Sequence, residues 1–236
     1  MNSIPLLCFP FAGAGASFFR PWKDLVRGRF EVMPIQLPGR EKRFVEEPYR
    51  DVAQAIEGVL PDVLKQIEGY PRVAIFGHSM GAILAYELAR RLVETAAVGV
   101  ELLVVSGSPG PWHGREQRAT GLDDEAFLAR VREFAGYSHA ALSNPDMRAM
   151  LLPVFRADVE LHENYQPSSD QPLAVPILSV RGASDEIVSA KQIAQWQQAT
   201  NESFSVVELS GGHMYLTETP AQLLDVIEKT LAVHKS

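Results

Sequence analysis

The sequence predicts an α/β protein with a mostly parallel central sheet flanked by helices. Short apolar runs alternate with longer amphipathic stretches, and several of the runs are continuously apolar, as in strands that are covered on both faces. Alternation of this kind is typical of βαβ units, which build parallel sheets. A chain of 236 residues, with 46% hydrophobic and 22% charged residues, can bury the core of one such domain.

Six apolar runs are the expected strands: Ile4–Phe9, Arg29–Gln36, Arg72–Gly77, Glu101–Ser106, Ile177–Gly182 and Phe204–Leu209. Four stretches have helical periodicity: Val52–Ile67, Met80–Leu92, Ala190–Ala199 and Ala221–Val233. Pro61 predicts a kink or a break in the first helix, because proline removes a backbone N–H and clashes with the preceding turn. Thr219 and Pro220 are typical of an N-cap followed by proline at the first helical position.

The stretch from about residue 107 to 170 contains no run that is typical of a strand, but it has helical patterns around Asp124–Phe134 and Pro145–His162. We therefore expect one domain, 1–236, with a helical insertion at about 107–170 over the carboxyl edge of the sheet. The second pattern carries an apolar stripe that either lines a substrate chamber or packs on a neighbouring helix. This stripe consists of Met147, Met150, Leu151, Leu152 and Phe155.

Composition argues against several classes of protein. Lys and Arg number 22 against 29 Asp and Glu, and a net charge of −7 is unlike that of a non-specific nucleic-acid binder. The single cysteine, Cys8, allows neither an internal disulfide nor a cysteine-based metal cluster. No apolar stretch approaches the roughly 20 residues of a membrane span, and the first residues do not resemble a signal peptide. We expect a cytoplasmic protein without nucleic-acid or membrane partners.

The sharpest motif is Gly77-His78-Ser79-Met80-Gly81, between a predicted strand and a predicted helix. This is the context of the G-x-S-x-G nucleophile motif, in which a strained turn presents the serine above the sheet. Glycines flank the serine because side chains there would clash. We predict Ser79 as a nucleophile at the positive end of the following helix, the alternative being a structural serine in a tight turn.

A serine nucleophile needs a base, and the base needs an orienting acid, in the chain order Ser, Asp or Glu, His. His213 follows the sixth predicted strand and is the predicted base, since parallel sheets gather their sites where the strands end. Asp185 follows the fifth predicted strand and is the predicted acid, with Glu186 as the fallback. The alternative for Asp185 is a helix-capping role.

The tetrahedral intermediate of acyl transfer needs an oxyanion hole. Its first donor is predicted to be the backbone N–H of Met80, which follows the nucleophile. The second is expected from the Gly- and Ala-rich loop after the first strand, where we predict Ala12, with Phe11 as the alternative. A phosphate-binding interpretation of this loop fails because Phe18 stands where the third glycine of G-x-G-x-x-G belongs.

With these motifs, the sequence resembles the type II thioesterases that accompany polyketide synthases and non-ribosomal peptide synthetases. The likeness extends over nearly the whole chain, in the segments CFPFAGAGASFFRPW, QLPGREKRFVEEP, GHSMGAILAYELAR, DVELHENY, RGASDEIV and GGHMYL. The first two segments are far more specific than the serine motif. The family often has a glycine pair after FPxA, where this chain has Gly13-Ala14-Gly15.

The resemblance implies an α/β-hydrolase fold with a helical lid and a triad of Ser79, His213 and Asp185. It implies hydrolysis of acyl groups stalled on the phosphopantetheine arm of acyl or peptidyl carrier proteins, with no metal and no cofactor, and we expect a monomer. The alternatives are a carboxylesterase or medium-chain fatty acyl thioesterase on the same fold, and a catalytically inactive binding module.

Charge is unevenly distributed along the chain. Residues 20–50 hold eight Lys and Arg and five acids, a net charge of +3 against −10 for the remainder. Carrier proteins are usually acidic, so this stretch, including Arg40 and Arg43, is a candidate docking face. The alternative is an ordinary solvated surface.

Overall fold

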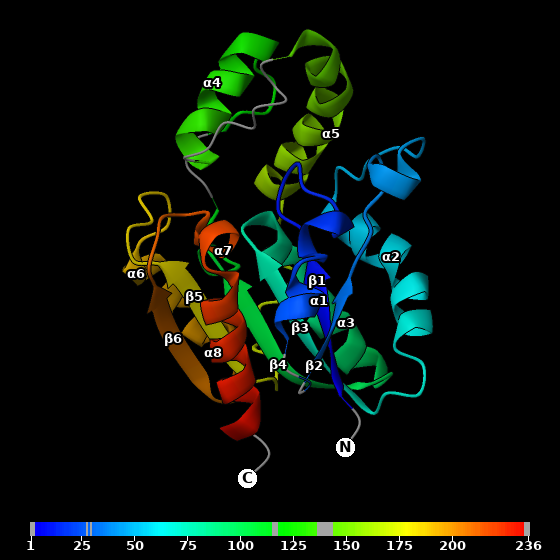
Figure 1. The fold of residues 1–236 in the computed structure, drawn as a ribbon, viewed down its shortest axis with the longest axis vertical. Helices are drawn as coiled ribbons and strands as arrows, with labels where there is room; N and C mark the ends of the chain where they lie inside the picture. The colour runs from blue at the N-terminus through cyan, green and yellow to red at the C-terminus, as the bar shows by residue number, and fades with distance from the viewer. Residues whose placement is uncertain (1–2, 27, 29, 115–117, 136–143, 234–236) are drawn as a thin grey trace.

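A six-stranded sheet forms the centre of the protein, and helices cover both of its faces (Figure 1). The computed structural model describes residues 3–26, 28, 30–114, 118–135 and 144–233. The strands are β1 (Ile4–Phe9), β2 (Phe30–Pro34), β3 (Arg72–His78), β4 (Gly99–Ser106), β5 (Ile177–Gly182) and β6 (Phe204–Leu209). They lie in the order β2-β1-β3-β4-β5-β6, and every adjacent pair is parallel. The predicted α/β class is confirmed.

Each of the six predicted strands is present, with small changes at the ends. β2 ends at Pro34, two residues earlier than predicted, and Arg29 at its predicted start lies outside the described residues. β4 begins two residues earlier than predicted, at Gly99, and β3 continues to His78. Strand ends depend on local pairing, which an apolar pattern does not determine closely.

Alternate side chains of the sheet enter two separate cores. Val73 and Ile75 of β3 join a core with α2 (Val52–Gln66) and α3 (Met80–Thr95). Ala74 and Phe76 join the opposite core. The sheet is therefore the middle of three layers, and burial on both faces explains the continuous apolar runs.

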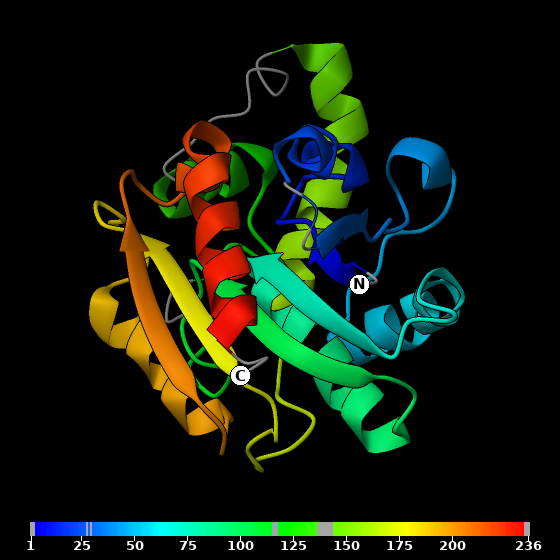
Figure 2. The same ribbon diagram turned by 60° about the horizontal axis from the view of Figure 1, so that its bottom comes forward.

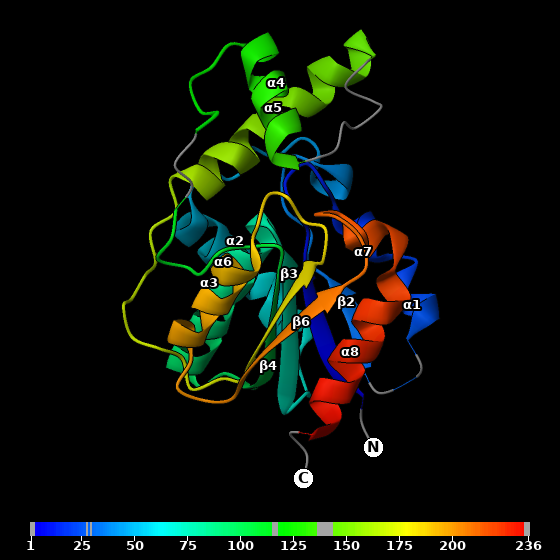
Figure 3. The same cartoon turned by 90° about the vertical axis from the view of Figure 1, so that its left-hand side faces the viewer.

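The helices that cover the second face are α1 (Trp22–Leu25), α7 (Tyr215–Glu218) and α8 (Pro220–Val233). Figure 3 shows them on one side of the sheet, with α2, α3 and α6 (Ala190–Ala194) on the other. Short 3-10 turns complete the described helices: η1 (Ala16–Phe19), η2 (Glu41–Arg43) and η4 (Gln195–Ala199). The predicted helix Ala190–Ala199 is thus an α-helix that continues as a 3-10 turn.

The predicted interruption at Pro61 does not break α2, which is one helix from Val52 to Gln66. Pro61 is exposed, whereas Val59 and Val63 beside it are buried in the core. The proline removes one backbone hydrogen bond on the solvent side, while burial of the opposite face holds the helix together.

The segment between β4 and β5 carries two helices above the carboxyl end of the sheet (Figure 1). These are α4 (Asp124–Ala135) and α5 (Pro145–Glu163), which we call the lid helices. They share a small core of their own, in which Phe127 and Leu128 of α4 meet Leu152 of α5. Residues 115–117 and 136–143 of the predicted insertion lie outside the described residues.

The direction of the strand order changes at β1. β2 lies on one side of β1, whereas β3 to β6 follow on the other. Loops that leave neighbouring strands toward opposite faces open a crevice at the carboxyl edge, which is where open α/β sheets bind ligands. Within the described part of the chain, no helix has the length and apolar character needed to cross a membrane.

Candidate active site

Ser79 occupies a strained turn between β3 and α3. Its φ of +52° and ψ of −119° are unusual for a residue with a side chain. A Cβ at Gly77 would lie 1.9 Å from the carbonyl oxygen of Gly81, and a Cβ at Gly81 would lie 2.7 Å from that of Phe9. Backbone packing therefore requires both glycines, which is the steric reason expected for a nucleophile motif.

His213 and Asp185 are joined by a hydrogen bond at the carboxyl end of β5 and β6. The His213 Nδ1 atom lies 2.9 Å from Asp185 Oδ2, and the two residues are only 8% and 5% exposed. The other oxygen, Oδ1, accepts the backbone N–H groups of Ile187 at 2.8 Å and Val188 at 3.0 Å. The carboxylate thus has a partner on each oxygen, and one of them is the predicted base.

Two opposing effects act on the pKa of the Asp185 carboxyl. Burial raises it, but the hydrogen bond and electrostatic attraction of His213 and the two backbone N–H groups outweigh burial. The net pKa lies below its ordinary value, so Asp185 is a carboxylate at neutral pH.

Close packing of two loops brings this pair together across 28 residues of sequence. The Ser184 N–H donates to the Gly211 carbonyl at 2.9 Å, and a Cβ at Gly182 would lie 2.1 Å from the Gly212 carbonyl oxygen. Only a glycine at position 182 allows this approach. Glu186, the fallback acid, is exposed.

A second histidine lies beside the predicted base. The ring centroids of His78 and His213 are 4.8 Å apart, and His78 is fully buried. The His78 Nδ1 atom lies 2.9 Å from Ser106 Oγ, which lies 2.7 Å from the Tyr215 hydroxyl. Burial, and then the charge of His213, hold the pKa of His78 well below its usual range, so this ring is neutral at pH 7. The sequence did not predict this contact.

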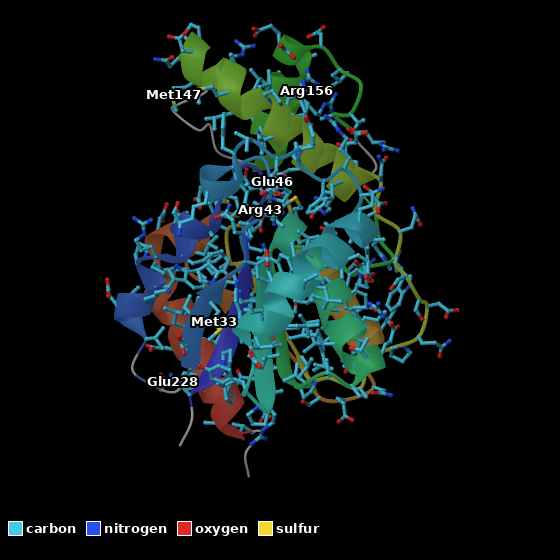
Figure 4. The ribbon with its side chains drawn as sticks, turned by 90° about the vertical axis from the view of Figure 1, so that its right-hand side faces the viewer. Met33, Arg43, Glu46, Met147, Arg156 and Glu228 are labelled. Atoms are coloured by element: carbon cyan, nitrogen blue, oxygen red, sulfur yellow. The ribbon has the colours of Figure 1, made fainter. Side chains whose placement is uncertain are left out.

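A cavity of about 720 Å³ opens in front of Ser79, between the loop after β1 and the lid helices. Ser79, His213 and Ala12 lie on its wall, and Met80 is buried at the start of α3. Four of the five residues of the predicted apolar stripe also line the cavity: Met147, Met150, Leu151 and Phe155. Leu152 instead turns into the small core of the lid. Figure 4 shows Met147 at the end of α5 that lies away from the sheet.

The basic stretch of residues 20–50 was predicted as a candidate docking face, and one of its residues does not fit that prediction. Arg40 is only 8% exposed and forms an ion pair of 2.6 Å with Asp158 of α5, so its assignment to an exposed face is wrong. Arg43 pairs with Glu46 at 2.6 Å. Figure 4 labels both residues, which lie between the sheet and the lid helices. Charge counting could not anticipate Asp158, because that partner lies 118 residues away.

Among the described residues, no group of three or more His, Cys, Asp and Glu side chains is arranged to hold a metal ion. A serine on a strained turn, a buried His–Asp pair and helices above the carboxyl edge of a parallel sheet are the features of an α/β-hydrolase fold. A model of the thioesterase domain family matches residues 4–231, and the chain belongs to that family.

Individual relatives agree with this assignment. The chain is 34% identical over 229 residues to the gramicidin S biosynthesis protein GrsT of Aneurinibacillus migulanus, covering 97% of this chain and 89% of that protein. The solved structure of RedJ, a thioesterase from the prodiginine biosynthetic pathway in Streptomyces coelicolor, is 33% identical with a TM-score of 0.87, covering 96% of this chain and 89% of the other. The type II thioesterase BorB from the borrelidin biosynthetic cluster is 32% identical with a TM-score of 0.86, covering 98% and 93%.

Proposed function

We propose that this protein is a type II thioesterase that hydrolyses acyl groups from the phosphopantetheine arm of acyl or peptidyl carrier proteins. The observation that carries the proposal is the buried His213–Asp185 pair beside a cavity that also has Ser79 on its wall. Membership of the thioesterase family and similarity to proteins named for the biosynthesis of gramicidin S, prodiginine and borrelidin support it.

In the proposed acylation step, His213 Nε2 accepts the hydroxyl proton of Ser79 as Oγ attacks the thioester carbonyl carbon. The Asp185 carboxylate accepts a hydrogen bond from the Nδ1–H group of His213. The ring proton therefore stays on Nδ1, and Nε2 carries no proton in the resting enzyme. The intermediate collapses, the C–S bond breaks, and the thiol leaves with the proton that His213 held. The acyl group is now an ester of Ser79.

In the proposed deacylation step, His213 removes a proton from water as the water oxygen attacks the ester carbonyl carbon. The bond between that carbon and Ser79 Oγ then breaks, His213 returns the proton to Oγ, and the carboxylic acid is released. In both steps the negative oxygen is held by the backbone N–H groups of Met80 and Ala12. Loss of one such donor costs roughly 3 kcal/mol of transition-state stabilisation. The start of the 16-residue helix α3 adds its positive dipole end at the same place.

The cavity supports an acyl chain as the bound group. Most of the lid residues on its wall are apolar, including Met150, Leu151 and Phe155, and these favour a hydrocarbon over a polar ligand; Arg132, His162 and Glu163 are the charged or polar lid residues on the wall. The triad alone does not separate a thioester from an oxygen ester. The choice of a thioester therefore rests on the family.

The test is mass spectrometry of one carrier protein loaded with several acyl groups, incubated with the wild-type protein or with Ser79→Ala. We expect release of the acyl groups by the wild-type protein alone. A preference for a nitrophenyl ester over every thioester would indicate a carboxylesterase, and a preference for acyl-coenzyme A would indicate a fatty acyl thioesterase. No hydrolysis, together with no labelling of Ser79 by a fluorophosphonate, would indicate a binding module.

A further inference from the structure

A buried ion pair joins lid helix α5 to the loop that follows β2. The guanidinium of Arg40 donates two parallel hydrogen bonds to Asp158, from Nη1 to Oδ2 at 2.7 Å and from Nη2 to Oδ1 at 2.6 Å. The side chains are 9% and 2% exposed. Burying such a pair gains little stability over an apolar pair of the same shape, but it fixes the relative position of the two segments in a defined geometry.

The same pair also holds the loop after β1, which carries the proposed second oxyanion donor. The backbone N–H of Gly13 donates to Asp158 Oδ2 at 2.7 Å. Arg40 Nη1 donates to the carbonyl oxygen of Ala14 at 2.9 Å, and its Nε donates to the Pro38 carbonyl at 3.2 Å. Two successive residues of the loop are therefore bound to one carboxylate and one guanidinium.

The bound residues belong to a tight turn around Ala12. The Ala14 N–H donates to the Phe11 carbonyl at 3.0 Å, which closes a four-residue turn. Gly13 has a φ of +78° while Ala12 has no positive φ, as in a type II turn. With the turn closed at Ala14 and held at Gly13, the Ala12 peptide cannot rotate without breaking these bonds.

Lid helix α5 also packs against this turn through an apolar contact. A Cβ at Gly13 would lie 3.1 Å from Cδ2 of Phe155, which is one turn before Asp158 on the same helix. Figures 1 and 2 show α5 beside the dark-blue loop that follows β1. The helix thus contacts the loop through both a ring and a carboxylate.

We propose that Asp158 and Arg40 are positioning residues that set the geometry of the oxyanion hole. They hold Gly13 and Ala14, and through them the Ala12 N–H, at a fixed place relative to Ser79. Because Asp158 belongs to α5, the lid helix is coupled directly to the group that stabilises the transition state. This inference rests on the proposed function, since it requires an acyl transfer at Ser79.

The test is Asp158→Asn, which replaces one accepting oxygen by an NH₂ group and removes the charge. We expect kcat to fall roughly 10- to 100-fold, because a misplaced oxyanion donor costs at most about as much as a deleted one. KM is expected to change less than about threefold. The affinity for a trifluoromethyl ketone, whose adduct with Ser79 carries an oxyanion, is expected to fall by the same factor as kcat. The affinity for the product acid and the pH dependence of kcat/KM are expected to stay unchanged.

Glu87→Gln is the matched control. Glu87 is a buried carboxylate, 7% exposed, that accepts the Tyr165 hydroxyl at 2.6 Å and the Ser168 N–H at 3.2 Å away from the cavity wall. This variant is expected to lose stability while keeping its kcat and its ketone affinity. Arg40→Lys keeps the charge but not the two-pronged bond, and it is expected to give an intermediate loss of kcat.

Several results would overturn the inference. One is a normal kcat for Asp158→Asn. Others are a raised KM with unchanged ketone affinity, or an equal loss of ketone affinity in Glu87→Gln. If Asp158→Asn does not fold, Arg40→Lys decides the question by the same readouts. A wild-type protein that hydrolyses no ester or thioester contradicts the proposed function instead, whereas an active wild-type protein with an equally active Asp158→Asn contradicts only this inference.

Discussion

Replacing Asp185 by asparagine is expected to place His213 in the wrong tautomer. The Asp185 Oδ1 atom accepts two backbone N–H groups, at 2.8 and 3.0 Å, so the single oxygen of an asparagine will be held at that position. The NH₂ group then occupies the place of Oδ2, 2.9 Å from His213 Nδ1. Facing a donor, Nδ1 must accept, and the ring proton moves to Nε2, which can no longer take the proton of Ser79.

The size of the loss follows from this inversion. Two of the three hydrogen bonds to the side chain are kept, so the backbone of the loop should remain in place. In a serine protease triad, the same exchange lowers kcat by about 10⁴, equivalent to roughly 5 kcal/mol of activation free energy. We expect a similar factor for Asp185→Asn. The accompanying loss of folding stability is expected to be about 1–3 kcal/mol, because hydrogen bonds to a charged carboxylate are replaced by weaker neutral ones.

The assay combines steady-state thioester hydrolysis, the rate of fluorophosphonate labelling of Ser79 and thermal unfolding. Glu186→Gln is the control, because Glu186 is adjacent but exposed, and its activity is expected to match the wild type. An Asp185→Asn variant that keeps more than about a tenth of the activity would refute the tautomer argument. A large loss in Glu186→Gln would move the role of the acid to that residue.

Three further outcomes are expected. Gly81→Ala places a Cβ 2.7 and 2.8 Å from two backbone oxygens at the end of β1, so it should lower the stability by about 1–3 kcal/mol and slow the labelling of Ser79. As its control, Gly114→Ala, whose Cβ would meet no described residue within 4 Å, should change neither thermal unfolding nor labelling. Leu151 lines the cavity, so the larger side chain of Leu151→Trp should fill part of it and raise KM for long acyl chains but not for acetyl. An equal rise for all chain lengths would contradict the assignment of this cavity as the acyl-binding site. Because folding lowers the pKa of Asp185, its stabilising contribution is complete above the unfolded value near pH 4 and is lost as the pH falls through the folded pKa. The difference in unfolding free energy between the wild type and Asp185→Asn should therefore be largest at neutral pH and shrink in acid, and a difference independent of pH would contradict this.

The sheet could be predicted because its strands carry a strong local signal. A strand buried on both faces must be continuously apolar, and that pattern is visible without any knowledge of its neighbours. Pro61 shows where local reasoning stops, since its effect depends on whether the opposite face of the helix is buried. Similarly, α7 (Tyr215–Glu218) has only four residues, too few for a periodic pattern, and it was not predicted.

The contact between predicted site residues could be anticipated where each residue follows the end of a strand. Asp185 and His213 follow β5 and β6, which are neighbours in the sheet, so the topology alone brings their loops together. The contact of His78 with His213 depends instead on ring orientations in a buried turn. Its only sequence signal was its position between a buried strand and the nucleophile.

Arg40 shows why a count of charges misjudges a surface. Such a count treats every arginine as solvated, but burial is possible wherever a carboxylate is placed to meet the guanidinium. The sequence carries no local sign of that partner, because Asp158 lies 118 residues away on another element. The Arg40–Asp158 ion pair joins three of the segments by which the chain resembles its family: the loop after β1, QLPGRE around Arg40, and DVELHENY, which begins at Asp158. These segments are far apart in the sequence and show no sign of belonging together. In the fold they contact one another beside the proposed oxyanion hole.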